Sequence, residues 1–140
     1  MTKKNAAARP PIQMIDTEAN GLATLAMDAA ERAPEVSSLL LGEIERAQIH
    51  ARGSLSLDVV TMGSIVEFID EASSADRTIE LVYPRHADIS AGRVSILTPV
   101  GAGLIGLRTG QSILWPDRSG HERRLTIVKV RQPDISEPAG

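Results

Sequence analysis

The chain has 140 residues, with 15 basic and 18 acidic side chains for a net charge of −3, no cysteine and only 2% aromatic residues. This length allows one domain of ordinary size with a small appendage, because two full hydrophobic cores would each lie near the lower limit of independent stability. The absence of cysteine excludes disulfides, thiolate nucleophiles and cysteine-based metal sites. The slightly acidic balance disfavours a non-specific DNA-binding protein, which needs a surplus of Lys and Arg near phosphates.

Both ends of the chain are expected to be unstructured. Residues 1–13 contain Lys3, Lys4 and two prolines, and they lack the apolar run of a secretory signal. Residues 133–140 carry two prolines and two acids, which predicts a flexible tail. No segment approaches about 20 consecutive apolar residues, so no membrane span is expected. These features predict a cytoplasmic protein; a mitochondrial-type presequence is the alternative, because three basic residues precede the first acid.

Residues 14–53 predict two amphipathic helices. From residue 16 to about residue 31, apolar side chains recur at the i, i+3, i+4, i+7 spacing of one helical face. Pro34 separates this helix from the next, because proline disfavours helical backbone in the residue before it and suits the first turn of a new helix. The second apolar stripe covers residues 36–47, with Gly53 placed as a stop. So short a connection predicts an antiparallel hairpin, which either projects as a short coiled coil or covers the core as a lid.

The pattern changes to strands in residues 54–132. Short segments rich in β-branched residues predict strands at residues 64–70, 78–83, 93–97, 111–115 and 123–131. Turn-forming residues at 72–76 and 117–120 fit hairpin connections, so the sheet is expected to be largely antiparallel. Between the third and fourth strands, Thr98 is placed to cap a short helix whose first residue is Pro99. The predicted fold class is α+β, a helical hairpin followed by a sheet domain with one short helix.

The last predicted strand is amphipathic and locally basic. Its alternation places Leu125, Ile127 and Lys129 on one face, and the other face carries Arg124, Thr126, Val128 and Val130. The basic residues of this region are Arg118, His121, Arg123, Arg124, Lys129 and Arg131. They are interpreted as a solvated strand face or as a surface for an acidic protein partner. RNA is less favoured, because no second aromatic residue stands nearby for base stacking.

Residues 101–106, Gly-Ala-Gly-Leu-Ile-Gly, match the G-x-G-x-x-G pattern of dinucleotide-binding folds. That site also needs a second parallel strand and an acid about 20 residues further on, where this sequence predicts a hairpin turn. Tight packing of a short helix is therefore the preferred interpretation, and an anion at the helix start is the alternative. The three histidines, His50, His86 and His121, lack metal-ligand spacing, and no serine lies in a G-x-S-x-G motif.

Three acids cluster where the two predicted helices meet. Asp28 and Glu31 lie on one helical face because they are three residues apart, and Glu35 begins the next helix. The hairpin tip is therefore expected to be negatively charged. It is interpreted as a solvated tip or, alternatively, as a group that presents carboxylates to a basic channel or to a shared Mg²⁺.

Two stretches of the sheet region carry a family resemblance. They are Asp58-Val59-Val60-Thr61-Met62-Gly63-Ser64 and residues 81–116, LVYPRHADISAGRVSILTPVGAGLIGLRTGQSILWP. In these stretches the chain closely resembles the Rnk family of bacterial regulators of nucleoside diphosphate kinase, which belongs with the Gre transcript-cleavage factors. The resemblance covers nearly all of residues 58–131, and residues 1–57 match more loosely.

The resemblance implies an FKBP-like domain at residues 54–132, a coiled-coil hairpin at residues 14–53, and binding to bacterial RNA polymerase. In the Gre family the C-terminal domain docks at the rim of the secondary channel, and a D-x-x-E pair at the hairpin tip helps to hold a catalytic Mg²⁺. Asp28-Ala29-Ala30-Glu31 has this spacing, but Arg32-Ala33-Pro34 follows instead of the Gre tip sequence, and the arms are shorter. A carboxylate must lie within about 2–2.5 Å of such an ion, so we expect no stimulation of RNA cleavage.

We therefore expect a regulator rather than an enzyme, without a cofactor, a catalytic residue or a bound metal. Its expected partner is core RNA polymerase near the secondary channel, where it would compete with longer Gre-type factors. Neither a membrane nor a specific DNA sequence is an expected partner, and the protein is expected to be a monomer. The candidate partner-binding residues are Asp28, Glu31, Glu35, Arg123 and Arg124, of which the three acids are also the only metal candidates. The alternatives are a peptidyl-prolyl isomerase-like peptide-binding domain and a protein that acts directly on nucleoside diphosphate kinase.

Overall fold

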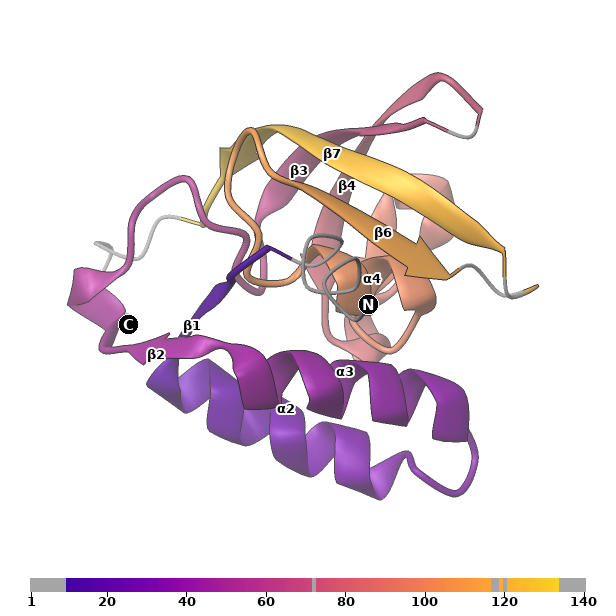
Figure 1. Ribbon diagram of the computed structural model, residues 1–140. Coiled ribbons are helices and arrows are strands. Elements are labelled where there is room, and N and C mark those ends of the chain that lie inside the picture. The colour runs from indigo at the N-terminus through magenta and orange to yellow at the C-terminus, as the bar shows by residue number, and fades with distance from the viewer. Residues whose placement is uncertain (1–9, 72, 117–118, 120, 134–140) are drawn as a thin grey trace, which may run out of the picture.

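The computed structural model describes residues 10–71, 73–116, 119 and 121–133, and its main element is a five-stranded sheet (Figure 1). The strands are β3 (Ile65–Asp70), β4 (Ala75–Val82), β5 (Arg93–Ser95), β6 (Ser112–Pro116) and β7 (Glu122–Arg131). They follow the order β5-β4-β3-β7-β6, and the neighbouring pairs are antiparallel except for the parallel pair β4-β5. The predicted α+β class with a largely antiparallel sheet is therefore confirmed.

Two helices form a hairpin at the bottom of the view in Figure 1: α2 (Asp16–Asp28) and α3 (Pro34–Arg46), each of 13 residues. The short helix α4 (Pro99–Leu104) follows Thr98, whose Oγ1 accepts a hydrogen bond from the Gly101 amide at 3.1 Å. The predicted cap and the two helix-starting prolines are therefore confirmed. Within the described residues, none of the helices combines the length and the hydrophobicity that a membrane span requires.

The hairpin packs against the sheet domain and does not project from it. Leu22, Ala26 and Leu40, on the apolar stripes of α2 and α3, are fully buried in one core cluster with the sheet residues Val66 and Leu125. In Figure 1, α3 runs below α4, and the two helices are in contact. Of the two arrangements considered for the hairpin, the lid over the core is the one observed. Helices this short are marginally stable alone, and burial against the sheet domain supplies the missing apolar contact.

Residues 10–13, which we expected within a disordered N-terminus, take part in the fold. Ile12 is 1% exposed, and the strands β1 (Gln13–Ile15) and β2 (Gln48–His50) form a second, two-stranded parallel sheet. This pairing explains why α3 stops well before the predicted stop at Gly53. The residues that follow α3 are extended in β2, and its first amide donates to the Ile12 carbonyl oxygen at 2.9 Å.

Several expectations concern residues that the structure does not describe. These are the start of the chain at residues 1–9, the tail at residues 134–140, and the turn residues Ala72, Asp117, Arg118 and Gly120. The expected disorder of both ends and the contribution of Arg118 to the basic surface therefore stay predictions.

A β-bulge in β7 changes the predicted face of its last residues. Glu67 pairs with Lys129, whereas the next residue of β3 pairs with Ile127, and the register shifts between them. Val128 is therefore an extra residue in the ladder. After the bulge, Val130 packs against the core and Lys129 is exposed, so the predicted alternation is wrong from Lys129 onward. One extra residue moves a strand of period two onto its opposite face.

Candidate functional site

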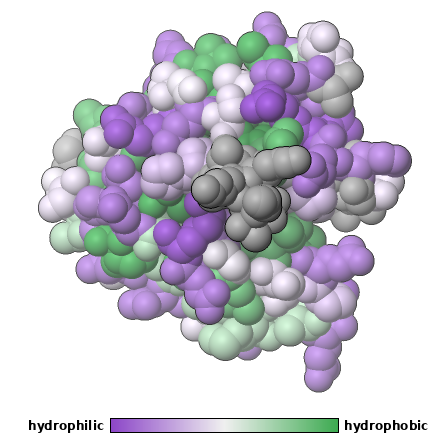
Figure 2. Space-filling view, viewed as in Figure 1, coloured by the Kyte–Doolittle hydropathy of each residue, from purple (hydrophilic) through white to green (hydrophobic). Residues whose placement is uncertain are grey.

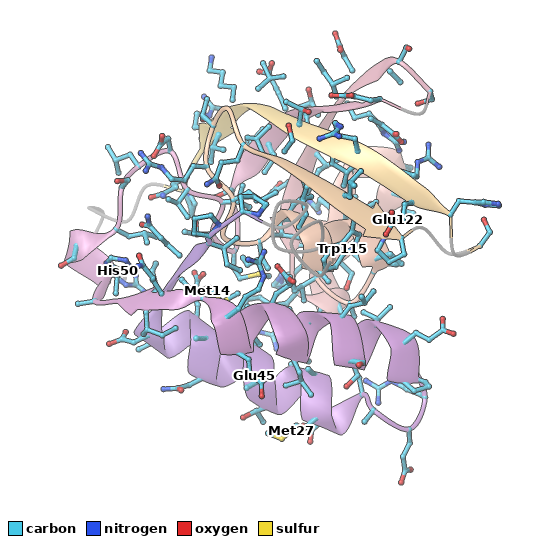
Figure 3. All side chains as sticks on the ribbon, viewed as in Figure 1. Met14, Met27, Glu45, His50, Trp115 and Glu122 are labelled. Carbon is cyan, nitrogen blue, oxygen red and sulfur yellow. The ribbon has the colours of Figure 1, made fainter. Side chains whose placement is uncertain are left out.

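The glycine motif at residues 101–106 serves helix packing. A Cβ on Gly101 would collide with the backbone carbonyl oxygen of Ser95, and a Cβ on Gly103 would lie 2.9 Å from the Trp115 ring. Figure 3 shows this ring where β6 passes α4. The strand after α4, β6, pairs antiparallel with β7, so this segment does not form the βαβ unit of a dinucleotide site. Most of α4 is buried, which also disfavours an anion at its start.

The three acids at the hairpin tip do not assemble a metal site. Asp28 ends α2, Glu31 lies in the connecting turn and Glu35 lies in the first turn of α3; all three are exposed. Arg32 donates a hydrogen bond to the Asp28 backbone carbonyl oxygen at 3.4 Å. Among the described residues, which include all three histidines, no group of three His, Asp or Glu side chains comes together to hold a metal ion. The tip is an exposed acidic surface.

The two arginine candidates in β7 have different surroundings. Arg123 donates two hydrogen bonds to Asp70, at 2.6 and 3.2 Å, and the Asp70 side chain is only 7% exposed. Arg124 lies 3.6 Å from Glu71, and both of these side chains are about half exposed. Arg123 therefore belongs to a structural ion pair, whereas Arg124 is accessible to a partner.

A pocket that no sequence motif indicated lies where α2 begins beside the end of β4, and we call it the Glu18 pocket. It is open to solvent, with a volume of about 530 Å³. The polar side chains that line it are Thr17, Glu18, Arg52, Glu80, Tyr83 and His86, together with the apolar Met62 and Val82. These residues come from separate segments of the chain, so local patterns could not reveal the pocket. Only Tyr83 and His86 stood out by residue type, as one of three aromatic residues and one of three histidines.

Two titratable groups of the Glu18 pocket have shifted pKa values. Burial raises the pKa of Glu18, against smaller lowering effects of the Met62 amide, which donates to Oε1 at 3.2 Å, and of the Arg52 charge. Burial also raises the pKa of Tyr83; the Glu18 carboxylate adds to this effect, and Arg85 opposes it. The pocket therefore holds a partly buried carboxylate close to a partly buried phenol.

Replacing Glu18 with glutamine is expected to make the free energy of unfolding less sensitive to pH. Because the pKa of Glu18 is higher in the folded than in the unfolded chain, the folded state binds more protons at pH values between the two pKa values. The contribution of Glu18 to the free energy of unfolding of the wild type therefore falls as the pH rises from 4.5, the ordinary pKa, through the folded pKa. Above that range the carboxylate carries its full burial penalty, whereas glutamine keeps a carbonyl oxygen as acceptor for the Met62 amide.

Urea unfolding at about pH 4 and about pH 7 measures this difference between Glu18→Gln and the wild type. Glu31→Gln at the exposed tip is the control for the change in net charge. If the gain of Glu18→Gln over the wild type is no larger at the higher pH than at the lower one, the effect of burial on Glu18 is contradicted.

The aromatic residues do not form a proline-binding cup. Phe68 and Trp115 are each 2% exposed, and the Trp115 indole N–H donates to the Pro99 carbonyl oxygen within the core. Of the aromatic residues, only Tyr83 lines the Glu18 pocket. A peptidyl-prolyl isomerase would need an aromatic-lined site for proline. In the described part of the chain, the geometry does not favour that alternative.

Comparison with known proteins identifies the family. Residues 55–132 match the family model described as transcription elongation factor, GreA/GreB, C-terminal. Over 130 residues the chain is 34% identical to the regulator of nucleoside diphosphate kinase of Escherichia coli strain K12, covering 92% of this chain and 96% of that protein. Over 131 residues it is 34% identical to the transcription elongation factor GreA of Azorhizobium caulinodans, covering 88% of this chain and 83% of that one.

The structure agrees with the sequence comparisons. The solved prokaryotic transcription elongation factor GreA/GreB of Nitrosomonas europaea superposes with a TM-score of 0.68 at 35% identity, covering 88% of this chain and 99% of that one. The chain therefore belongs to the GreA/GreB family of transcription elongation factors. The resemblance carried by residues 58–64 and 81–116 is confirmed. The names of these relatives denote a regulator and elongation factors, not catalysts.

Proposed function

We propose that this protein regulates transcription by binding bacterial RNA polymerase near its secondary channel, without stimulating RNA cleavage. The relatives that span most of the chain support a role in transcription, because they are named as elongation factors and as a regulator. The observation that carries the proposed lack of RNA cleavage is the packing of the hairpin along the sheet domain, which limits how far the tip acids can reach. An FKBP-like domain at residues 54–132 would be the docking part, and the hairpin at residues 14–53 would extend it only slightly.

A hairpin of this size cannot carry its acids far from the sheet domain. Its helices have 13 residues each, which corresponds to about 20 Å at about 1.5 Å per residue, and part of that length lies against the core. A carboxylate that delivers a metal must lie within about 2–2.5 Å of the ion. The exposed acids Asp28, Glu31 and Glu35 therefore fit a contact at the channel entrance, where the protein would compete with longer Gre-type factors.

Purified protein is expected to co-elute with core RNA polymerase at micromolar concentrations. The double substitution Asp28→Ala and Glu31→Ala is expected to leave this binding nearly intact, because both residues are exposed at the hairpin tip and do not belong to the proposed docking domain. Backtracked polymerase complexes are expected to release no more cleaved RNA with the protein than without it. The proposal fails if no association appears at micromolar concentrations.

The location of the tip on the polymerase can be measured with a single crosslinker. The chain has no cysteine, so Glu31→Cys provides a unique attachment point. We expect crosslinks to the polymerase subunits that surround the secondary channel, and fewer of them when a GreA factor is added as competitor. Crosslinks confined to surfaces remote from the channel would contradict the proposed location.

A second function is favoured by the name of one relative. The Escherichia coli protein is called a regulator of nucleoside diphosphate kinase, so direct contact with that kinase is the alternative. Two measurements separate the possibilities: the amount of kinase in cells with and without the protein, and the activity of the purified kinase. Changed expression with unchanged purified activity supports transcriptional control, whereas changed purified activity supports direct contact.

A further inference from the structure

We propose that the Glu18 pocket binds an arginine side chain of a partner protein, with Glu18 as its ion-pair partner and Tyr83 as its stacking surface. The identity of the partner rests on the proposed function, because RNA polymerase is the protein that we expect to present this side chain. The chemistry of the pocket does not depend on that function.

Glu18 has acceptor capacity that the described residues leave unused. The Met62 amide donates to Oε1 at 3.2 Å, and none of the described residues donates to Oε2. Arg52 acts on the carboxylate through its charge, but no ion pair joins the two side chains within the described part of the chain. An ionised carboxylate offers about four lone-pair sites, and a charge-assisted hydrogen bond is stronger in a partly dehydrated site than in water. Glu18 can therefore accept a further cationic donor.

The arrangement of charges in the pocket favours a cation over an anion. The acids Glu18 and Glu80 are partly buried, whereas the bases Arg52 and His86 are exposed. Among the described residues, the ion-pair contact of the Glu80 carboxylate is a long one, 3.8 Å to Arg93, and the Glu80 side chain is 41% exposed. A phosphate that entered the pocket would approach two carboxylates of like charge. The pocket therefore disfavours a nucleotide or a nucleic acid and favours a basic side chain.

An arginine side chain matches the other features of the pocket. Its guanidinium presents five donors in a planar fork, which binds a carboxylate with two hydrogen bonds and stacks on an aromatic ring. Tyr83 supplies the ring. The buried side chains of Met62 and Val82 supply apolar contact for the methylene groups of the arginine. A lysine would bring a single point charge without a plane that stacks, so arginine is the better fit.

Apolar surface does not offer an equally specific docking site. In Figure 2 the hydrophobic residues of the visible face form several small groups separated by hydrophilic residues. The large apolar side chains that are exposed among the described residues are Met27, Ile49, Leu57, Ile89 and Val128, which come from different segments. Figure 3 shows Met27 at the outer side of the hairpin, away from the sheet. Isolated exposed apolar residues are normal on protein surfaces.

An NMR titration of the ¹⁵N-labelled full chain with acetyl-Gly-Arg-Gly-amide tests the pocket. We expect saturable shifts of the Glu18, Gly63 and Tyr83 amides, weaker binding of the matched lysine peptide, and no binding of the matched citrulline and glutamate peptides. Glu18→Gln is expected to weaken binding of the arginine peptide about tenfold, because it removes the charge but keeps the shape. Tyr83→Leu should weaken it about threefold through the loss of stacking. Glu31→Gln, at the hairpin tip, should change nothing.

Three outcomes of the titration overturn the proposal. The first is a larger response to the glutamate peptide than to the arginine peptide. The second is full binding of the arginine peptide to Glu18→Gln when the spectrum of that variant shows a folded protein. The third concerns the tail, because Pro133 lines the pocket. If the arginine peptide binds only after removal of residues 134–140, the tail is the occupant of the pocket.

The polymerase measurement separates this inference from the proposed function. If the wild type associates with core polymerase and Glu18→Gln loses about tenfold in affinity while Glu45→Gln, at an exposed position of α3, does not, both are supported. If the wild type does not associate at all, the proposed function fails, and the peptide titration still decides whether the pocket binds arginine. If Glu18→Gln binds the polymerase as tightly as the wild type does, the assignment of the pocket to this partner is overturned.

Discussion

Gly101→Ala is expected to lower the free energy of unfolding by about 3 kcal/mol or more, at the upper end of overpacking effects. The new Cβ would collide with the carbonyl oxygen of Ser95, the last residue of β5. A backbone atom held in a sheet cannot move aside as the end of a flexible side chain can. Gly103→Ala is expected to cost about 1–3 kcal/mol, because its Cβ would meet the buried Trp115 ring.

Gly42→Ala in α3 is the matched control for this prediction. Nothing lies within 4 Å of the position that its Cβ would take, so alanine should stabilise the helix by about 0.5–1 kcal/mol. Urea unfolding followed by circular dichroism compares the two variants with the wild type. If Gly101→Ala unfolded at the same urea concentration as the wild type, the packing role of the glycine motif would be refuted. A motif that serves only a nucleotide would tolerate the methyl group in the unliganded protein.

Arg123→Ala is expected to lower the free energy of unfolding by about 3 kcal/mol. The substitution removes two hydrogen bonds, at 2.6 and 3.2 Å, from the Asp70 carboxylate, whose side chain is 7% exposed. A carboxylate in such a site loses the guanidinium without gaining full hydration in return.

Arg124→Ala, one position further along β7, is the control for Arg123→Ala. Its contact to Glu71 is 3.6 Å long and both side chains are about half exposed, so we expect a loss of no more than about 1 kcal/mol. Thermal or urea unfolding of both variants measures the difference. Equal losses would show that the burial of Asp70 does not matter. Arg124→Ala is also the better probe of partner binding, because its effect on the fold is small.

The start of α4 shows how much of the fold local chemistry can predict. Thr98 accepts a hydrogen bond from the amide of Gly101, and Pro99 follows as the first helical residue, as expected from residue types alone. Both signals act within three positions along the chain. Pro34 acts equally locally at the start of α3, and the apolar stripes of the two long helices act within one helix each.

Contacts between distant segments account for the errors. Residues 10–13 have little local signal for order, and their structure depends on pairing with β2, more than 30 positions further along the chain. Val130 faces the core where Lys129 was predicted to do so, because the register of β7 against β3 contains a bulge. The sequence of β7 alone contains no information on that register.

Apolar spacing, prolines and capping side chains act over a few residues, and for that reason the chain alone predicted the hairpin and the five strands. The family was indicated separately, by the resemblance that residues 58–64 and 81–116 carry. The docking of the hairpin on the sheet domain, the ion pair of Arg123 with Asp70, and the placement of Glu18 beside Tyr83 were decided by tertiary structure. Burial, and the loss of hydration that shifts a pKa or strengthens an ion pair, exists only where distant segments meet. The acidic tip could therefore be found in the sequence, but the Glu18 pocket could be found only in the fold.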